Sequence, residues 1–423
     1  MTASSPPVRP VHLGIVGMAR ILPAHLRGLR VLRDNGLANV RITALCARKI
    51  EDAATFRRPG EGPPPRPPVT TNERDPLGAP HTYVSDLFPD TVPELYDDWR
   101  KMLEADAADA VLVLSPVGLH HQIALDVLRA GKHVLIEKPF AISVRAGQAI
   151  VDEAQKRGLI VGVAENLRYA EGIRALNWVV QQGVIGEPQM WVSGGIGGDW
   201  SPDKIVARTP WRHRKLEGGG GGAIDIGVHL FHFIRYVMGP IEEISAYART
   251  LERERVERDA FGEVINRVTN EVEDAFFANI RFGNGAIGTT FWSWGGHGDR
   301  LGLAADPGIF GSLGCVKGSE VVLDDGFRGQ TTALFAHQAP PSLRRALFPA
   351  GITDSFALEM HDFLSAIGSG LPMEASGAEG LLDLATAFAL LESATANRPV
   401  TVTDVLNGKV SAYQEEIDAH YGL

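Results

Sequence analysis

The chain has 423 residues, a formal net charge of −10, 44% hydrophobic and 22% charged residues, and 47 glycines. This length and composition are typical of an α/β globular protein with two or three domains. The acidic balance argues against a general nucleic-acid or anionic-membrane surface, although backbone N–H groups can still hold an anionic cofactor.

Short apolar strands alternate with helices in the first part of the chain. The predicted strands are residues 11–16, 41–46, 110–114, 132–136 and 160–164, and the predicted helices are about 23–33, 93–104, 119–130 and 144–156. This order predicts a parallel, doubly wound sheet, and we assign residues 1–140 to a Rossmann dinucleotide-binding domain. Residues 57–80 are rich in proline and glycine and predict an exposed loop or partly disordered insertion.

The turn after the first strand is the candidate phosphate-binding motif. It follows a degraded G-x-G-x-x-G pattern, with Ala19 in the second glycine position and Leu22 in the third. The predicted cofactor contacts in this turn are Gly17, Met18, Ala19, Arg20 and Ile21. The pattern alone is equally typical of any tight turn between a strand and a helix.

After Glu165 the pattern changes to successive strand-like runs. A helix is predicted over residues 171–182, then strands over 189–193, 241–249, 273–282, 286–294, 308–316 and 320–323, and finally helices over 355–368 and 377–396. The dipeptide Gly283-Asn284 marks a hairpin turn. These features predict a C-terminal α+β domain, residues 141–423, with a large open, mostly antiparallel sheet.

Two short stretches carry the candidate chemistry. The strand 132–136 runs into Glu137-Lys138-Pro139, whose last bond is a candidate cis peptide. A glycine run, residues 218–222, leads into a predicted helix with Asp225 and His229 on one face, four residues apart. A lysine, a carboxylate and an imidazole that converge near a dinucleotide suit the oxidation of an alcohol.

Each of these features also has a purely structural interpretation. A lysine before proline at a strand end is usually solvated, and a glycine run is usually a flexible loop; next to Asp225 it instead favours close backbone approach to cofactor or substrate. His229 and His232 have a spacing that suits metal ligands, but no third ligand follows at a recognisable distance, so no metal is predicted.

Several motifs in order resemble those of one known family. The most specific are GKHVLIEKP (131–139) and GGGAIDIGVH (220–229), supported by GIVGMARI, SPVGLHHQIAL, ENLRY, RFGNGAIGT and ANRPV. The chain resembles the oxidoreductase family named for glucose–fructose oxidoreductase, inositol dehydrogenase and the rhizopine-catabolism protein (Gfo/Idh/MocA). The resemblance implies a Rossmann domain, a second domain with an open sheet, and NAD- or NADP-dependent interconversion of an alcohol and a ketone on sugars, inositols and related polyols.

The resemblance also implies roles for individual residues. Lys138 would polarise the carbinol oxygen, His229 would act as the general base, and Asp225 would hold a second hydroxyl or tune Lys138. The resemblance also implies that four residues lie near the cofactor: Ser115, Pro116, His120 and Glu137. It implies that Arg168 and Tyr169 lie at the border of the active site. His121 is expected at the surface. Trp211 and Arg212 lie in a loop that suits either sugar stacking or interface packing.

The choice of cofactor is predicted from the end of the second strand. An NAD enzyme usually places an acidic residue there for the ribose hydroxyls. Here the strand ends in Cys46-Ala47-Arg48-Lys49, and the first carboxylate is Glu51. Arg48 suits a 2′-phosphate, so the sequence favours NADP over NAD.

The sequence is compatible with three functions. The first is an NAD(P)-dependent dehydrogenase or reductase acting on a sugar, inositol, polyol or glycoside. The second is redox-neutral glycoside cleavage through transient sugar oxidation, and the third is a non-catalytic sugar or dinucleotide sensor. Apolar strands in the second domain favour a homodimer or homotetramer. The two cysteines, the polar start of the chain and the lack of a spanning-length apolar run favour a cytoplasmic protein that binds neither nucleic acid nor membrane.

Overall fold

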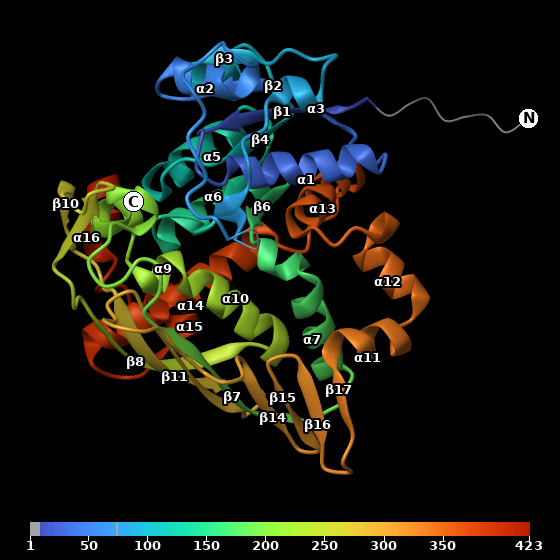
Figure 1. Cartoon of the computed structure of the whole chain (residues 1–423), viewed down its shortest axis with the longest axis vertical. Helices are drawn as coiled ribbons and strands as arrows, with labels where there is room; N and C mark the ends of the chain where they lie inside the picture. Colours follow the sequence, from blue (N-terminus) through green and yellow to red (C-terminus); the bar gives the residue numbers. More distant parts are fainter. Residues whose placement is uncertain (1–8, 73–74) are drawn as a thin grey trace, which may run out of the picture.

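The computed structural model describes residues 9–72 and 75–423. The upper part of the molecule in Figure 1 is built on a six-stranded sheet of order β3-β2-β1-β4-β5-β6, in which every pair is parallel. Its strands are β1 (Val11–Val16), β2 (Val40–Cys46), β3 (Glu94–Tyr96), β4 (Ala110–Val113), β5 (His133–Glu137) and β6 (Val161–Ala164). The predicted Rossmann domain is therefore confirmed. The predicted boundary after residue 140 lies before β6, which pairs with β5 in this first sheet.

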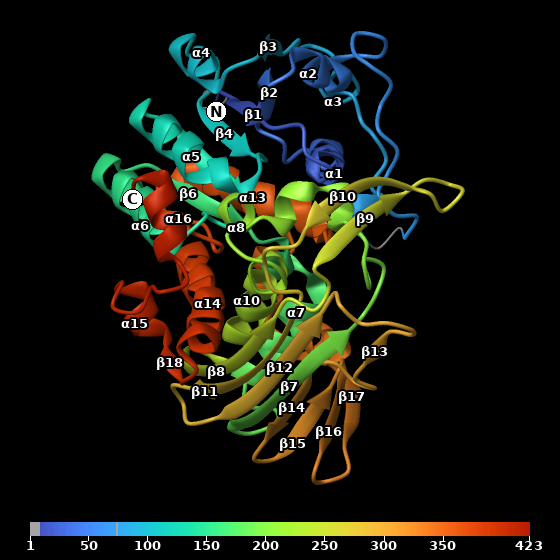
Figure 2. The same cartoon turned by 90° about the vertical axis from the view of Figure 1, so that its left-hand side faces the viewer.

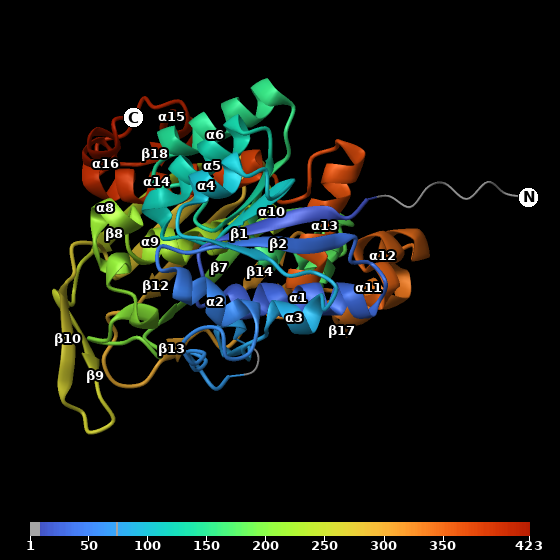
Figure 3. The ribbon, with the colours of Figure 1, turned by 90° about the horizontal axis from the view of Figure 1, so that it is seen from above.

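Helices connect these strands on both sides of the sheet, as Figure 3 shows from above. They are α1 (Leu22–Asp34), α2 (Ile50–Arg57), α3 (Val84–Leu87), α4 (Trp99–Glu104), α5 (His120–Arg129) and α6 (Val144–Arg157). The prediction of one helix over residues 93–104 is wrong for the first half of this range. Residues 94–96 pair with the edge of β2, and α4 begins only after Asp98, whose side chain accepts a hydrogen bond from the Arg100 N–H at 2.8 Å.

The proline-rich insertion connects the two halves of the molecule. Between α2 and the 3₁₀ turn Pro76–Gly78, its described residues form neither helix nor strand, as predicted. Leu77 packs against a small apolar cluster of the second domain, formed by Val206, Ala207 and Trp294. In Figure 2 the insertion descends from the level of α2 toward the hairpin β9 (Glu254–Arg258) and β10 (Val264–Thr269), a pair that the sequence did not predict.

The second domain is built on a larger sheet of order β17-β16-β15-β14-β7-β12-β11-β8-β18, with β13 also paired to β7. Only β7 and β12 run parallel among these pairs, so the predicted, mostly antiparallel sheet is confirmed. Its strands are β7 (Pro188–Ile196), β8 (Ile241–Arg249), β11 (Ala275–Phe282), β12 (Ile287–Ser293), β13 (Leu301–Gly302), β14 (Gly308–Gly311), β15 (Gly314–Lys317), β16 (Glu320–Leu323), β17 (Arg328–Gln330) and β18 (Val400–Thr401). The single strand predicted over residues 308–316 is a hairpin, because Ser312 and Leu313 turn away to donate to the carbonyls of Glu187 and Ile185.

In the part of the chain that the structure describes, helices cover only one face of this second sheet (Figures 1 and 2). They include α7 (Glu171–Gln181), α10 (Gly227–Met238) and α14 (Gly377–Ala396), which lie between the two sheets. The remaining helices are α8 (Lys215–Gly218), α9 (Gly222–Asp225), α11 (Thr331–Gln338), α12 (Pro341–Leu347), α13 (Ser355–Ser369), α15 (Val402–Leu406) and α16 (Glu415–Tyr421). Over residues 9–72 and 75–423, none of the helices has the length and apolar character needed to cross a bilayer.

Candidate active site

Lys138 lies where the first sheet meets the second domain. It follows β5 directly, and the Lys138–Pro139 bond is cis. The lysine Nζ donates to the backbone carbonyl of Asp225 at 2.7 Å and to its Oδ1 at 3.2 Å. The two stretches that the sequence singled out therefore do meet, and they place a partly buried ammonium group between the domains.

Asp225 is held between two cations. Arg212 Nε donates to Oδ2 at 3.2 Å, while Lys138 takes Oδ1. Burial opposes ionisation of this carboxyl, but the charges of Arg212 and Lys138 outweigh burial and hold the pKa of Asp225 well below its usual value. Asp225 is therefore an ionised acceptor at neutral pH, and it fixes the position of Lys138.

The single helix predicted to carry Asp225 and His229 is two helices. Helix α9 ends at Asp225, and α10 begins at Gly227 after the intervening Ile226. Gly222 and Gly227, which are poor helix formers, open the two segments. The break leaves the carbonyl oxygen of Asp225 free to accept from Lys138, a contact that a continuous helix would replace with its own hydrogen bond.

His229 is paired with a carboxylate that the sequence did not assign. Its Nδ1 lies 2.6 Å from Oε1 and 2.7 Å from Oε2 of Glu165. Glu165 is buried directly after β6; burial favours its neutral form, but the nearby charges, first of all His229, lower the pKa of Glu165. An ionised carboxylate can only accept, so Nδ1 of His229 carries a proton, and in the neutral form of the ring Nε2 is the proton acceptor. Within the described residues, that Nε2 has no hydrogen-bond partner.

The sequence assigns Glu165 to the ENLRY motif and predicts no role for it. One signal in the sequence points to it: a carboxylate at the carboxyl end of the last strand of a parallel sheet, the edge where such folds place their sites. Its pairing with His229, 64 residues later, follows only from the fold.

The glycine run approaches protein backbone. A Cβ at Gly221 would lie 1.8 Å from the carbonyl oxygen of Glu273, and one at Gly219, whose φ is +80°, would lie 2.9 Å from that of Ile142. The N–H groups of Gly221 and Ala223 donate to Oε1 of Glu273 at 2.9 and 2.8 Å. Gly221 thus lets Glu273 hold the start of α9, which carries Asp225, and Gly219 packs against the backbone at Ile142. The approach of this run to cofactor or substrate stays a prediction.

Glu273 is expected to make stability depend on pH. Burial raises the pKa of Glu273 to about 7, from an ordinary value of 4.5. Because the folded state favours the neutral form, its contribution is complete below about pH 4.5 and is lost as the pH rises through about 7. In Glu273→Gln, whose amide oxygen still accepts from α9, the free energy of unfolding should therefore fall less between pH 5 and pH 8, by about 2 kcal/mol. Urea unfolding at the two pH values measures this; an identical fall in both proteins would contradict it.

The turn after β1 has the geometry of a phosphate-binding turn. Gly17 has a φ of +99°, and a Cβ there would lie 2.7 Å from the backbone of Leu114. Within the described residues, the N–H groups of Met18, Ala19 and Arg20 donate to no protein acceptor. These free donors precede α1, so the turn fits the pyrophosphate of a dinucleotide.

Comparison with known proteins decides the family. The profile described as "Oxidoreductase family, NAD-binding Rossmann fold" matches residues 78–165, and that of the GFO/IDH/MocA C-terminal domain matches residues 173–316. The chain belongs to the Gfo/Idh/MocA oxidoreductase family. It is thus an oxidoreductase with a nicotinamide dinucleotide domain, as the resemblance implied.

Relatives within the Gfo/Idh/MocA family carry sugar and inositol names. Levoglucosan dehydrogenase of Pseudarthrobacter phenanthrenivorans is 26% identical over 73% of this chain and 83% of its own length. Myo-inositol 2-dehydrogenase of Thermotoga maritima is 26% identical over 74% of this chain and 86% of its own. A solved structure of levoglucosan dehydrogenase in complex with NADH, at 21% identity, superposes with a TM-score of 0.70 over 93% of this chain and 99% of that one, and so shows the same fold.

Other residues that the sequence singles out lie around this centre. Arg212 joins it through Asp225, and its guanidinium stacks 4.3 Å from the ring centroid of Trp211. Oε1 of Glu137 lies 3.4 Å from Nε2 of the buried His25. Both ring nitrogens of His120 lie 2.8 Å from backbone carbonyls, those of Ser115 and Pro139, so this buried histidine joins the ends of β4 and β5.

Two expectations differ from the structure, those for Tyr169 and His121. Tyr169 is fully buried and donates to Asp362 at 2.7 Å, so in this structure it packs the core and does not face the substrate side. Arg168 forms ion pairs with Glu374 and Glu379, at 3.6 and 3.8 Å, and its place at the border of the active site stays a prediction. His121, expected at the surface, is buried against Tyr421.

His229 and His232 do not converge. His232 pairs with Asp383 at 2.7 Å, whereas His229 pairs with Glu165. Over residues 9–72 and 75–423, no group of three or more His, Cys, Asp or Glu side chains is arranged to hold a metal ion.

Proposed function

We propose that the protein is an NAD(P)-dependent dehydrogenase or reductase that moves a hydride between a nicotinamide and a carbinol or ketone of a sugar, inositol, polyol or glycoside. The observation that carries this proposal is the cluster of Lys138, Asp225, His229 and Glu165, with Lys138 Nζ 2.7 Å from the Asp225 carbonyl. The named relatives, which include a D-glucoside 3-dehydrogenase of Escherichia coli at 32% identity over 46% of this chain, support this substrate class.

The residues divide the work of an alcohol oxidation. The nicotinamide, when bound, accepts or supplies the hydride. Lys138 presents a cation that polarises the carbinol oxygen and stabilises charge that develops on it. His229 takes the hydroxyl proton at Nε2, and Glu165 stabilises the positive charge that the imidazole then carries. Asp225 positions Lys138 and offers its carboxylate to a second substrate hydroxyl.

A substrate panel tests this proposal. Polyols, aldoses and glycosides are incubated with NAD or NADP, and the absorbance of the reduced cofactor is followed. Net reduction with at least one polyol or sugar is the expected result. Cleavage of a glycoside without net reduction would instead indicate the redox-neutral route, and binding without turnover of any substrate would indicate a sensor.

Arg48 favours NADP as the preferred cofactor. Its side chain is exposed at the end of β2, and within the described residues it has no ion-pair partner, so it is free to meet a 2′-phosphate. The solved structure of levoglucosan dehydrogenase is a complex with NADH. The affinities of this chain for NADH and NADPH therefore need direct comparison. Tighter binding of NADPH than of NADH in a calorimetric titration is expected; much tighter binding of NADH would overturn this preference.

The uncovered face of the second sheet favours a homo-oligomer. Cross-strand neighbours on this face are Tyr247 and Phe277, and Met190 and Ile287, which are 69%, 51%, 44% and 59% exposed. Phe277 also stacks on Phe291, with ring centroids 5.4 Å apart. So many apolar side chains on one face indicate a partner surface, and a second copy of the chain fits it.

Light scattering is expected to give the mass of a dimer or tetramer at micromolar concentration. Phe277→Asp, which places a charge in the middle of this face, should shift the mass toward a monomer. Leu371→Asp is the matched control, because Leu371 is 67% exposed outside the sheet. A monomer mass for the unaltered protein would contradict the prediction.

A further inference from the structure

The proline-rich insertion is fixed at both of its ends. We call its described residues, 58–72 and 75–80, the strap. At one end Thr55 Oγ1 donates to the carbonyl of Pro63 at 3.2 Å, and a Cβ on Gly62 would lie 2.4 Å from the Thr55 nitrogen. At the other end Val69 N–H donates to the carbonyl of Leu77 at 3.0 Å, and Leu77 packs on the second domain. The middle of the strap is therefore held over the cofactor domain.

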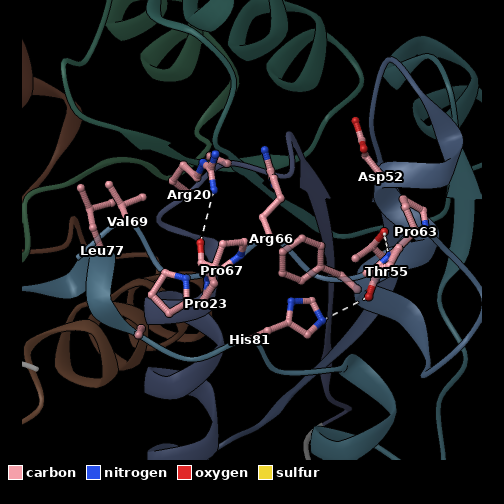
Figure 4. A pocket seen from close by; sticks show the side chains of 15 residues that line it. Arg20, Pro23, Asp52, Thr55, Pro63, Arg66, Pro67, Val69, Leu77 and His81 are labelled. Carbon is pink, nitrogen blue, oxygen red and sulfur yellow. Dashed lines mark hydrogen bonds between the residues drawn. The ribbon is translucent and has the colours of Figure 1, made fainter. Parts of the chain in front are cut away.

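The middle of the strap brings Arg66 to the phosphate-binding turn. Its guanidinium donates to the backbone carbonyl of Met18, and Arg20, from the turn itself, donates to the carbonyl of Pro67 at 3.4 Å. Turn, strap and α2 enclose a pocket of about 240 Å³. Figure 4 shows Arg20 and Arg66 side by side on this pocket, with the hydrogen bond from the Arg20 guanidinium to the carbonyl of Pro67.

The two arginines are neighbouring cations. Within residues 9–72 and 75–423, neither forms an ion pair with a carboxylate, although the chain has 51 acidic and 41 basic residues. Burial and the charges of Arg66 and Arg208 lower the pKa of Arg20, and the charge of Glu257 opposes this shift without reversing it. Asp52 also lines the pocket. Positive groups kept together without a direct ion-pair partner, beside free backbone N–H donors, suit an anionic ligand.

The sequence of the strap limits the cost of holding Arg66 in place. Prolines 63–65 precede it, and prolines 67 and 68 follow it. Successive prolines restrict φ and favour a stiff, extended backbone, so less conformational entropy is lost when the arginine is ordered. A flexible loop of the same length would present the guanidinium less often in a binding position.

We propose that the strap is a phosphate clamp, in which Arg66, together with Arg20, contacts the phosphates of the nicotinamide dinucleotide bound by the turn after β1. This assignment rests on the proposed function. It gives the insertion a role in cofactor affinity and assigns to Arg66 a binding role that no sequence motif indicates. It also links the cofactor site to the second domain through Leu77.

Calorimetric titration of the full chain with NADH, NADPH and adenosine tests the clamp. Arg66→Ala should raise the Kd for a dinucleotide by about 10- to 100-fold, the usual effect of losing a charge-assisted hydrogen bond. Arg66→Lys should lose less affinity for the dinucleotide, because lysine keeps the positive charge but lacks the planar guanidinium with its paired N–H donors. The affinity for adenosine, which has no phosphate, should not change. Arg58→Ala is the matched control, since Arg58 is an exposed arginine of the same strap.

The pattern of losses identifies the phosphate. Equal losses for NADH and NADPH would place Arg66 on the pyrophosphate, and a loss confined to NADPH would place it on the 2′-phosphate; either supports the clamp. Unchanged affinity for both dinucleotides in a folded Arg66→Ala protein would overturn it while leaving the proposed function intact. If the unaltered protein bound neither dinucleotide, the proposed function would fail and the clamp with it.

Discussion

Lys138→Ala is expected to lose turnover by about a hundredfold or more while the protein stays folded and keeps its affinity for the cofactor. The substitution removes the cation that faces the substrate oxygen. It leaves Asp225 paired with Arg212, so no buried carboxylate is stranded. Steady-state kinetics, circular dichroism and cofactor titration measure the three quantities.

Lys132→Ala is the matched control for Lys138→Ala. Lys132 immediately precedes the same strand, β5, and its ammonium group pairs with the exposed Asp106 at the opposite end of the strand from the site. Its loss should leave turnover unchanged. Normal turnover in Lys138→Ala would contradict the catalytic role of Lys138 and would favour a sensor or a site elsewhere on the chain.

Glu165→Gln is expected to reduce kcat by about a hundredfold, close to the effect of His229→Ala. Unlike a carboxylate, a glutamine can present an N–H₂ group to Nδ1 of His229, which favours the tautomer with the proton on Nε2 and removes the proton acceptor. The Gln variant also loses the negative charge that stabilises the protonated imidazole. KM should change little, because Glu165 is buried behind His229.

The double variant separates a shared role from two independent ones. If Glu165 acts only through His229, Glu165→Gln combined with His229→Ala should be no slower than His229→Ala alone. Glu171→Gln, six residues later and exposed, is the control and should keep full turnover. Full turnover in Glu165→Gln would show that the carboxylate does not position His229 for the reaction.

The meeting of Lys138 with Asp225 could be predicted from the sequence, because both lie in motifs whose order along the chain matches a known family. The pairing of Glu165 with His229 could not, since it depends on how α10 lies against the end of β6. The same limit applies to the strap. Its composition predicts the absence of regular structure correctly, but the contact of Arg66 with Met18 follows only from where both of its ends are fixed.

The errors in secondary structure have a common cause. Residues 94–96 have the apolar spacing of a helix start, yet they pair with the free edge of β2. Residues 308–316 have a composition typical of one uninterrupted strand. The N–H groups of Ser312 and Leu313 nevertheless donate to carbonyls in the loop before β7, and the chain reverses direction there. In both places, hydrogen bonds to distant segments outweigh the local preference.

The break between α9 and α10 has a genetic consequence. Lys138 is anchored in part by the backbone carbonyl of residue 225, and all twenty amino acids supply that same carbonyl. No codon change at position 225 deletes this anchor, so a saturation library there reports only on the side chain and leaves the lysine partly in place. Selection can reach the anchor only indirectly, through the residues at the break, such as Gly227, which opens α10. That glycine codon, which encodes no chemical group of the site, is therefore where a mutational scan should detect the loss of the lysine's position.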